Sequence, residues 1–182
     1  MTRRTTFPRV PPQPRALNIR LATAEDAGPI STLLIANSAA NGGTLYGDWS
    51  EAMISKWLAT GTPIVVAQNS GGIKGVLFSA ENAADAAPPV QAMFALALKK
   101  VIAPYAYGPI CVDTSLRGQG VPAKLYKLLK REMGTRRGIL FINRNNPGSL
   151  RAHAKLGMPI VGKFHLGDQT FDVLATPAKR SR

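Results

Sequence analysis

Val112-Asp113-Thr114-Ser115-Leu116-Arg117-Gly118-Gln119-Gly120-Val121-Pro122-Ala123 is the stretch of sequence that decides the fold of this chain. It leaves an apolar run, passes through a turn with two glycines and enters a helix whose apolar and basic residues fall on different sides. Glycines let a ligand approach the backbone closely, and the first amides of a helix have no partner within it. The pattern predicts an anion site that fits a pyrophosphate. It is not a Walker loop, because no Gly-Lys-Ser/Thr occurs, and it is not a Rossmann fingerprint, because its glycines are not spaced Gly-x-Gly-x-x-Gly.

Patterns on either side of this stretch predict the order strand, two helices, two strands, helix, strand, helix, strand, helix, strand, strand, without an internal repeat. Strands are expected at 17–22, 63–68, 73–79, 105–112, 138–143, 160–164 and 170–174. Helices are expected from Thr23 to about Ala39 and at 50–59, 90–103, 120–134 and 147–156. This order is typical of an α/β chain with a mixed sheet.

Two segments carry a resemblance to the GNAT superfamily of acyl-CoA N-acyltransferases. The signature Arg/Gln-x-x-Gly-x-Gly/Ala is met loosely by Arg117, Gly118, Gln119, Gly120 and Val121, followed by Pro122. Residues 146–158 look like the family's Asn-x-x-Ser-x-x-x-Tyr/His-x-x-x-Gly-Phe helix. The element order from 17 to 174 also fits, so the resemblance spans nearly the whole chain between its tails.

The resemblance implies a mixed, mostly antiparallel sheet of six to seven strands flanked by helices. This sheet would splay between the strand ending at Val112 and the strand starting near Gly138, leaving a wedge for the pantetheine arm of acetyl-CoA. Pro109 suits a bulge beside this wedge, because proline has no amide for a continuous ladder. An ordinary edge strand explains Pro109 equally well.

The implied activity is direct transfer of an acetyl group from acetyl-CoA to a primary amine of a small metabolite or amino-acid-like acceptor. The residues that the resemblance assigns to cofactor binding are Ile110, Cys111, Val112, Arg117, Gly118, Gln119, Gly120, Ala123, Asn146 and Ser149. Asn146 and Ser149 also read as helix-capping residues. Pro122 departs from the family pattern because it removes one backbone amide from the phosphate site, which predicts weakened or shifted binding.

His153 is the candidate catalytic residue, since it stands where the family often has a tyrosine that protonates the CoA sulfur. A packing role is the alternative. No carboxylate lies between 105 and 112, where the resemblance would suggest a general base, so water, Tyr105, Tyr107 or Glu81 stay open as alternatives. Asp113 is interpreted as an exposed loop residue.

The acceptor site is expected between 37 and 57, because the family's first helices overhang the amine. Tyr46 and Trp49, next to Asp48, are the predicted substrate-binding residues, since two aromatic rings beside a carboxylate can hold a cationic amine. Helix packing by Trp49 and Trp57 is the alternative explanation.

Composition limits the remaining classes of function. The single cysteine, Cys111, excludes a disulfide framework and a four-cysteine zinc site, and as a strand residue without an activating histidine it is interpreted as a core residue. We expect no metal. The cysteine count makes a reducing cytoplasm the expected compartment. The most apolar stretch, at 90–102, is short and interrupted by charge, which predicts no membrane span. The domain is expected at 16–176, between basic tails at 1–15 and 177–182.

The net charge of +13 is unevenly distributed along the chain. Residues 117–163 hold eleven basic side chains and one acidic one, whereas residues 20–116 hold five basic and seven acidic. This basic window suits the phosphates of CoA, and the absence of a base-recognition motif counts against nucleic acid. A catalytically silent acyl-CoA-binding regulatory module, a nucleic-acid-binding protein and a homodimer stay open as alternatives.

Overall fold

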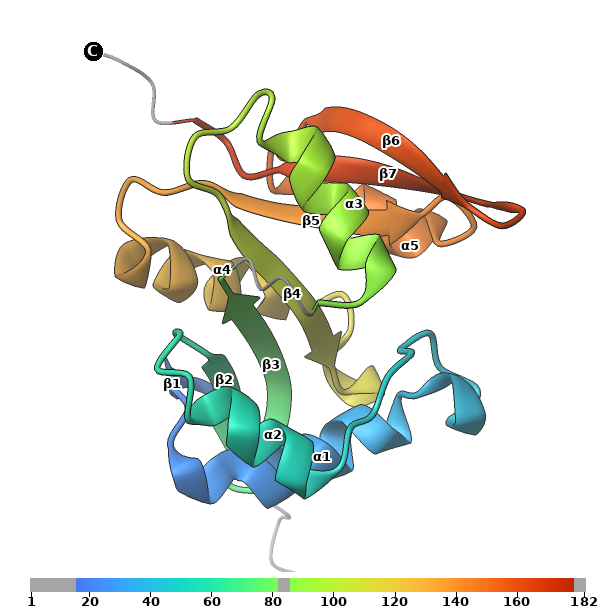
Figure 1. The fold of residues 1–182 in the computed structure, drawn as a ribbon. Coiled ribbons are helices and arrows are strands. Elements are labelled where there is room, and N and C mark those ends of the chain that lie inside the picture. Colours follow the sequence, from blue (N-terminus) through green and yellow to red (C-terminus); the bar gives the residue numbers. More distant parts are fainter. Residues whose placement is uncertain (1–15, 82–85, 179–182) are drawn as a thin grey trace, which may run out of the picture.

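The computed structural model describes residues 16–81 and 86–178, so the predicted tail at 1–15 and the last four residues of the other tail lie outside the described residues. Seven strands form one open sheet in the order β1-β2-β3-β4-β5-β7-β6 (Figure 1). Their bounds are Asn18–Leu21, Val65–Asn69, Gly72–Ala80, Tyr105–Val112, Gly138–Asn143, Ile160–Leu166 and Gln169–Ala175 for β1 to β7. All neighbours are antiparallel except β4 and β5, which confirms the expected mixed sheet.

Helices cover both faces of the sheet (Figure 1). Their bounds are Ala27–Ala36, Glu51–Leu58, Pro88–Ala97, Val121–Glu132 and Pro147–Lys155 for α1 to α5. The buried side chains of α1 and α2 pack with β2 and β3 in one core cluster, and those of α3 pack with β5, β6 and β7 in another. The buried residues of α4 form the third cluster on the opposite face, and part of α5 packs against it.

Two helices end earlier than the sequence predicts. α1 stops at Ala36 rather than near Ala39, because the chain turns there into a short 3-10 segment, Ala39–Asn41. α3 stops at Ala97 rather than Ala103. In the turn that follows, the amides of Lys100 and Val101 both donate to the carbonyl of Ala97, and the side chain of Val101 enters the core. This turn brings the chain to the start of β4.

β4 and β5 meet at only two residue pairs. Tyr105 lies opposite Gly138 and Ala106 opposite Ile139, after which no further pairing joins the two strands within the described residues. β4 continues to Val112 against β3, and β5 continues to Asn143 against β7. The sheet therefore splays at the place that the sequence predicts, between the strand ending at Val112 and the strand starting at Gly138.

A bulge interrupts β4 next to this split. Leu77 of β3 lies opposite Ile110, whereas Ser79 lies opposite Tyr107, so Gly108 and Pro109 share one partner position. The expected bulge at Pro109 is confirmed. Because side chains alternate between the two faces of a sheet, an extra residue in a strand moves every later side chain to the opposite face. Accordingly Tyr107 packs with the α4 cluster, and Cys111 packs with the α1 and α2 cluster.

Gly138→Ala tests the contact that holds the two halves of the sheet together. A methyl group at this position would lie 2.8 Å from Cζ of Tyr105, whose ring is fully buried and cannot move aside. We expect the free energy of unfolding, measured by urea denaturation, to fall by about 1–3 kcal/mol. In the control Gly162→Ala the new methyl meets only ordinary contacts with Leu96, so a change within about 1 kcal/mol is expected. Equal effects of both substitutions would contradict this account.

Candidate functional site

The split leaves one edge of β4 without a strand partner. Ile110, Cys111 and Val112 pair with β3 through Leu77, Val76 and Gly75, and on the β5 side the described chain offers them no strand. An extended ligand with amide groups can pair with such an edge as a strand would. The three β4 residues that the sequence assigns to the cofactor thus lie together along the opening.

The stretch from 113 to 120, which we call the cofactor loop, follows directly at the end of this open edge. Asp113 caps its first turn: one carboxylate oxygen accepts from the amide and hydroxyl of Ser115, and the other lies 3.2 Å from Nζ of Lys74. These hydrogen bonds lower the pKa of Asp113. Gly118 and Gly120 have φ angles of +77° and +70°, a region that side chains disfavour, so both glycines are needed to form the loop.

The loop presents free backbone donors at the start of α4. In the described part of the chain, the amides of Gly118, Gly120 and Val121 have no hydrogen-bond partner, whereas those of Gln119 and Ala123 donate to main-chain carbonyls. Pro122 occupies the first turn and supplies no donor. Open amides at the positive end of a helix dipole are suited to binding an anion, and the proline reduces the number of donors.

Arg117 reaches from the cofactor loop to a distant part of the chain. Its Nη2 donates to Oδ1 of Asn37 at 3.2 Å, although the two residues are 80 positions apart. Asn37 ends α1, and its Nδ2 donates to the carbonyl of Leu33. Sequence reasoning did not find Asn37, because no local pattern distinguishes this residue from an ordinary residue at a helix end.

The second motif forms the start of α5 and fixes the orientation of His153. Oδ1 of Asn146 accepts from the amide of Ser149 at 3.0 Å, which confirms the capping interpretation of Asn146. Nδ1 of His153 lies 2.8 Å from the carbonyl oxygen of Ser149. A carbonyl can only accept, so Nδ1 carries the proton of the neutral ring and Nε2 is an acceptor.

The ring of His153 lies against β4 at the point where the strands diverge. It contacts Tyr107 edge to face with the centroids 5.7 Å apart, and Tyr107 is the first residue after the last β4–β5 pair. Nε2 of His153 and the hydroxyl of Tyr107 are both buried and have no hydrogen-bond partner within the described residues. Burial lowers the pKa of His153 and raises that of Tyr107, so both side chains are held neutral.

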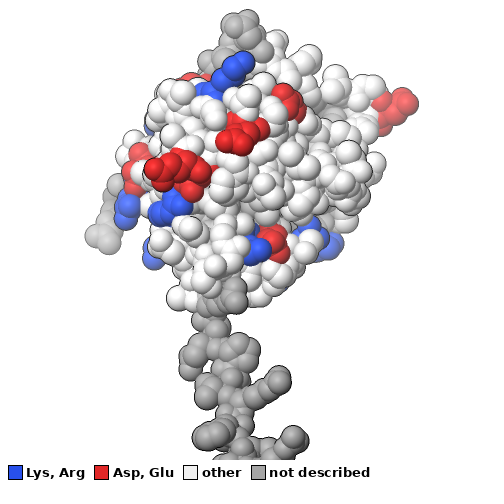
Figure 2. Space-filling model, turned by 90° about the horizontal axis from the view of Figure 1, so that it is seen from below, with Lys and Arg blue, Asp and Glu red and all other residues white. Residues whose placement is uncertain are grey.

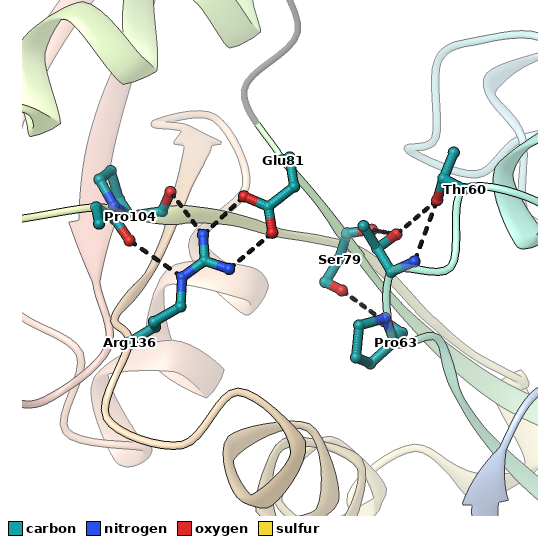
Figure 3. A network of polar contacts seen from close by, with 8 residues as sticks. Thr60, Pro63, Ser79, Glu81, Pro104 and Arg136 are labelled. Atoms are coloured by element: carbon teal, nitrogen blue, oxygen red, sulfur yellow. Dashed lines mark hydrogen bonds and ion pairs between the residues drawn. The ribbon is translucent and has the colours of Figure 1, made fainter.

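The other candidate bases are poorly suited to proton abstraction. Both carboxylate oxygens of Glu81 accept from the guanidinium of Arg136 at 2.7 Å (Figure 3), and this pair lowers the pKa of Glu81. Tyr105 lies where β4 and β5 still pair, and burial raises its pKa. Cys111 is buried, and burial raises the pKa of its thiol to about 11, which agrees with a core residue rather than a nucleophile.

The predicted acceptor residues line one open pocket of about 440 Å³. Its wall comes from the end of α1 and from the connection to α2: Ile35, Ser38, Ala39, Ala40, Leu45, Tyr46, Gly47, Asp48, Trp49 and Ser50. Tyr46 is 82% exposed, Trp49 is half-buried, and the indole Nε1 of Trp49 is buried without a partner within the described residues. Trp49 also packs against the core cluster of α1 and α2, and Trp57 packs on Phe78, so the helix-packing alternative holds for both rings.

The face of the protein drawn in Figure 2 and the outer side of α4 differ in charge. On the face of the protein at the lower end of Figure 1, Figure 2 shows separate acidic and basic groups on a mostly uncharged surface. The outer side of α4 is basic: Lys124, Lys127 and Arg131 border a groove of about 830 Å³ beside β1.

The described residues contain no group of three or more potential metal ligands and no helix long and apolar enough to cross a membrane.

Comparison with protein-family models and with curated protein sequences gives no match. Solved structures do match. The N-acetyltransferase from Staphylococcus aureus Mu50 is 22% identical, with a TM-score of 0.66 over 90% of this chain and 99% of that one. YncA of Salmonella typhimurium, named as an acetyltransferase and solved with its cofactor acetyl-CoA, is 16% identical, with a TM-score of 0.64 over 92% and 96%.

The acetyltransferase of the GNAT family from Streptococcus pneumoniae is 15% identical, with a TM-score of 0.60 over 90% of this chain and 100% of that one. At such low identity the likeness concerns the architecture, which these proteins share with this chain over almost their full lengths. The splayed sheet and the agreement with these structures together show that this chain has the GNAT fold.

Proposed function

We propose that this chain is an N-acetyltransferase that transfers an acetyl group from acetyl-CoA to a primary amine of a small metabolite or amino-acid-like acceptor. The observation that carries the proposal is the continuity of the split with the cofactor loop. An open strand edge from Ile110 to Val112 runs directly into a turn with three free backbone amides. An elongated ligand with amides along its length and a pyrophosphate at one end fits this arrangement.

The residues present fit acetyl-CoA as the donor. The edge of β4 would pair with the amides of the pantetheine arm, and the open amides of Gly118, Gly120 and Val121 would bind the pyrophosphate. Arg117 and Lys124 add positive charge beside these amides. Gln119 and Ala123, whose amides are used inside the loop, would shape the site instead of donating to the phosphates.

Direct transfer requires little beyond correct placement of the two substrates. The amine nitrogen forms a bond to the thioester carbon while the carbon–sulfur bond breaks. A neutral amine loses one proton in this step and the departing sulfur gains one. An amine that arrives protonated releases one further proton to the solvent before it attacks. The neutral ring of His153, with a free lone pair on Nε2, supports a role in accepting the amine proton. This assignment differs from the proton-donating role that the family resemblance implies.

The acceptor would bind in the pocket formed by the residues from Ile35 to Ser50. Tyr46 presents an exposed ring and Asp48 a carboxylate, and together they suit a cationic amine that loses its proton on moving toward the split. Hydrogen bonds from Ser50 lower the pKa of Asp48, so its carboxylate is charged at neutral pH.

The test is titration calorimetry with CoA, followed by a free-thiol assay with acetyl-CoA against a panel of amines and amino acids. Saturable CoA binding together with amine-dependent thiol release is the expected result. Binding without release for any amine would favour the alternative, a silent acyl-CoA-binding module. Absence of CoA binding would overturn the proposal.

Pro122→Ala should increase the affinity for CoA about three- to tenfold, because it restores one backbone donor to a phosphate. Titration calorimetry measures the change. Pro147→Ala, which replaces a proline in the first turn of α5, is the matched control and should leave the affinity unchanged. An affinity that is unchanged or lower in Pro122→Ala would show that the amide at this position does not face the ligand.

The rate of transfer should fall in acid, because protonation removes the lone pair of His153. Burial lowers the pKa of this residue, so kcat/KM of the wild type should stay level through neutral pH and decline below the ordinary histidine pKa of about 6.5. His153→Ala should lower kcat at least about 100-fold and abolish this decline while CoA still binds.

His165→Ala removes the exposed second histidine of the chain and serves as the control. It should keep both the rate and the pH profile. If activity in the wild type instead fell as the pH rose through this range, His153 would act in its protonated form and the accepting role would be wrong.

A further inference from the structure

We propose that Asn37 is a positioning residue that couples occupation of the cofactor loop to the order of the acceptor pocket. Within the described residues, the hydrogen bond from Arg117 to Asn37 is the only one that joins these two parts. The inference rests on the proposed function, since it assumes that CoA binds at the cofactor loop.

Asn37 begins a closed loop at 37–45, which we call the acceptor loop. Its two ends are joined by hydrogen bonds: the amide of Ala39 donates to the carbonyl of Leu45, and the amide of Leu45 donates to the carbonyl of Asn37. Between them, the amide of Gly43 donates to the carbonyl of Ser38 at 2.8 Å. A side chain at Gly43 would overlap the carbonyl of Asn37, so the loop folds back directly onto this residue.

The acceptor loop is also the wall of the predicted amine pocket. Ser38, Ala39, Ala40 and Leu45 line it, and Tyr46 follows immediately. The main chain of Asn37 anchors the loop, and its side chain binds Arg117. Any restraint on this side chain is therefore transmitted to the backbone that shapes the pocket.

Arg117 is suited to bind an anion and Asn37 at the same time. A guanidinium carries five N–H donors in a planar fork, and one of its nitrogens, Nη2, donates to Asn37. The side chain is exposed, and its backbone belongs to the loop with the open amides. A phosphate bound to the remaining donors would immobilise the guanidinium and strengthen its hold on Asn37.

This arrangement predicts positive coupling between the two sites. When bound CoA holds Arg117 in place, Arg117 in turn restricts the motion of the acceptor loop. The amine then pays a smaller conformational-entropy cost when it binds to this loop. The amine would then bind better to the CoA complex than to the free protein. Thermodynamic reciprocity requires the amine to increase the affinity for CoA by the same factor.

Hydrogen exchange on the full chain tests the coupling without knowledge of the acceptor, with CoA as the probe. Saturating CoA should slow exchange in the cofactor loop, which reports binding. It should also slow exchange of the bonded amides of Ala39, Gly43 and Leu45 in the acceptor loop by about fivefold or more. In Asn37→Ala the protection of the cofactor loop should persist and that of the acceptor loop should be lost.

Two variants separate coupling from simple loosening of α1. Asn41→Ala is the matched control: Nδ2 of Asn41 donates to the carbonyl of Ile35 as that of Asn37 does to Leu33, but Asn41 does not contact Arg117. It should keep the effect of CoA on the acceptor loop. Asn37→Asp keeps an oxygen for Arg117 and loses the bond to Leu33, so it should restore coupling that Asn37→Ala removes.

The outcomes are distinct. Protection of the cofactor loop without protection of the acceptor loop in the wild type would overturn the inference and leave the proposed function intact. An unchanged response of the acceptor loop in Asn37→Ala, or equal losses in Asn37→Ala and Asn41→Ala, would also overturn it. If CoA protected neither loop, the proposed function would fail and the coupling with it.

Discussion

The packing of Tyr105 against Gly138 is the contact on which the rest of the structure depends. It joins two half-sheets, each of which is otherwise antiparallel, at one short parallel junction. If the pairing extended further, the edge of β4 would be covered and no ligand could reach it. The length of the opening is therefore set by how soon β4 leaves β5 after Ala106.

Two polar but uncharged groups are buried beside the split. Tyr107 and His153 bring a hydroxyl and an imidazole nitrogen into a buried place, and burial keeps both neutral. Uncharged groups cost less to desolvate than a carboxylate would, so they can be enclosed before a ligand arrives. The charged side chains lie further away, with Arg117 and Lys124 where we propose that the phosphates bind and Asp48 in the pocket proposed for the amine.

Local patterns were sufficient to predict most of the fold. Alternating apolar residues and the glycines at 118 and 120 act over a few positions, so the sequence shows them directly. Pro109 left a bulge and an edge strand open, and the pairing of β3 with β4 decides for the bulge. The link between Arg117 and Asn37 depends on packing between segments far apart in the chain, and no short pattern reports it. The same holds for the ion pair of Glu81 with Arg136, which makes a carboxylate that looks available in the sequence a poor base. Helix ends were missed where core packing outweighed propensity, as at Val101.

The bulge that turns Cys111 toward α1 and α2 has a practical consequence. The chain has one sulfhydryl, and in the folded state it is 5% exposed and protonated at neutral pH. Thiol reagents therefore should not react with the protein while the β3–β4 ladder is closed. The rate at which a thiol reagent modifies Cys111 would therefore report opening of the β3–β4 ladder, with no engineered cysteine required.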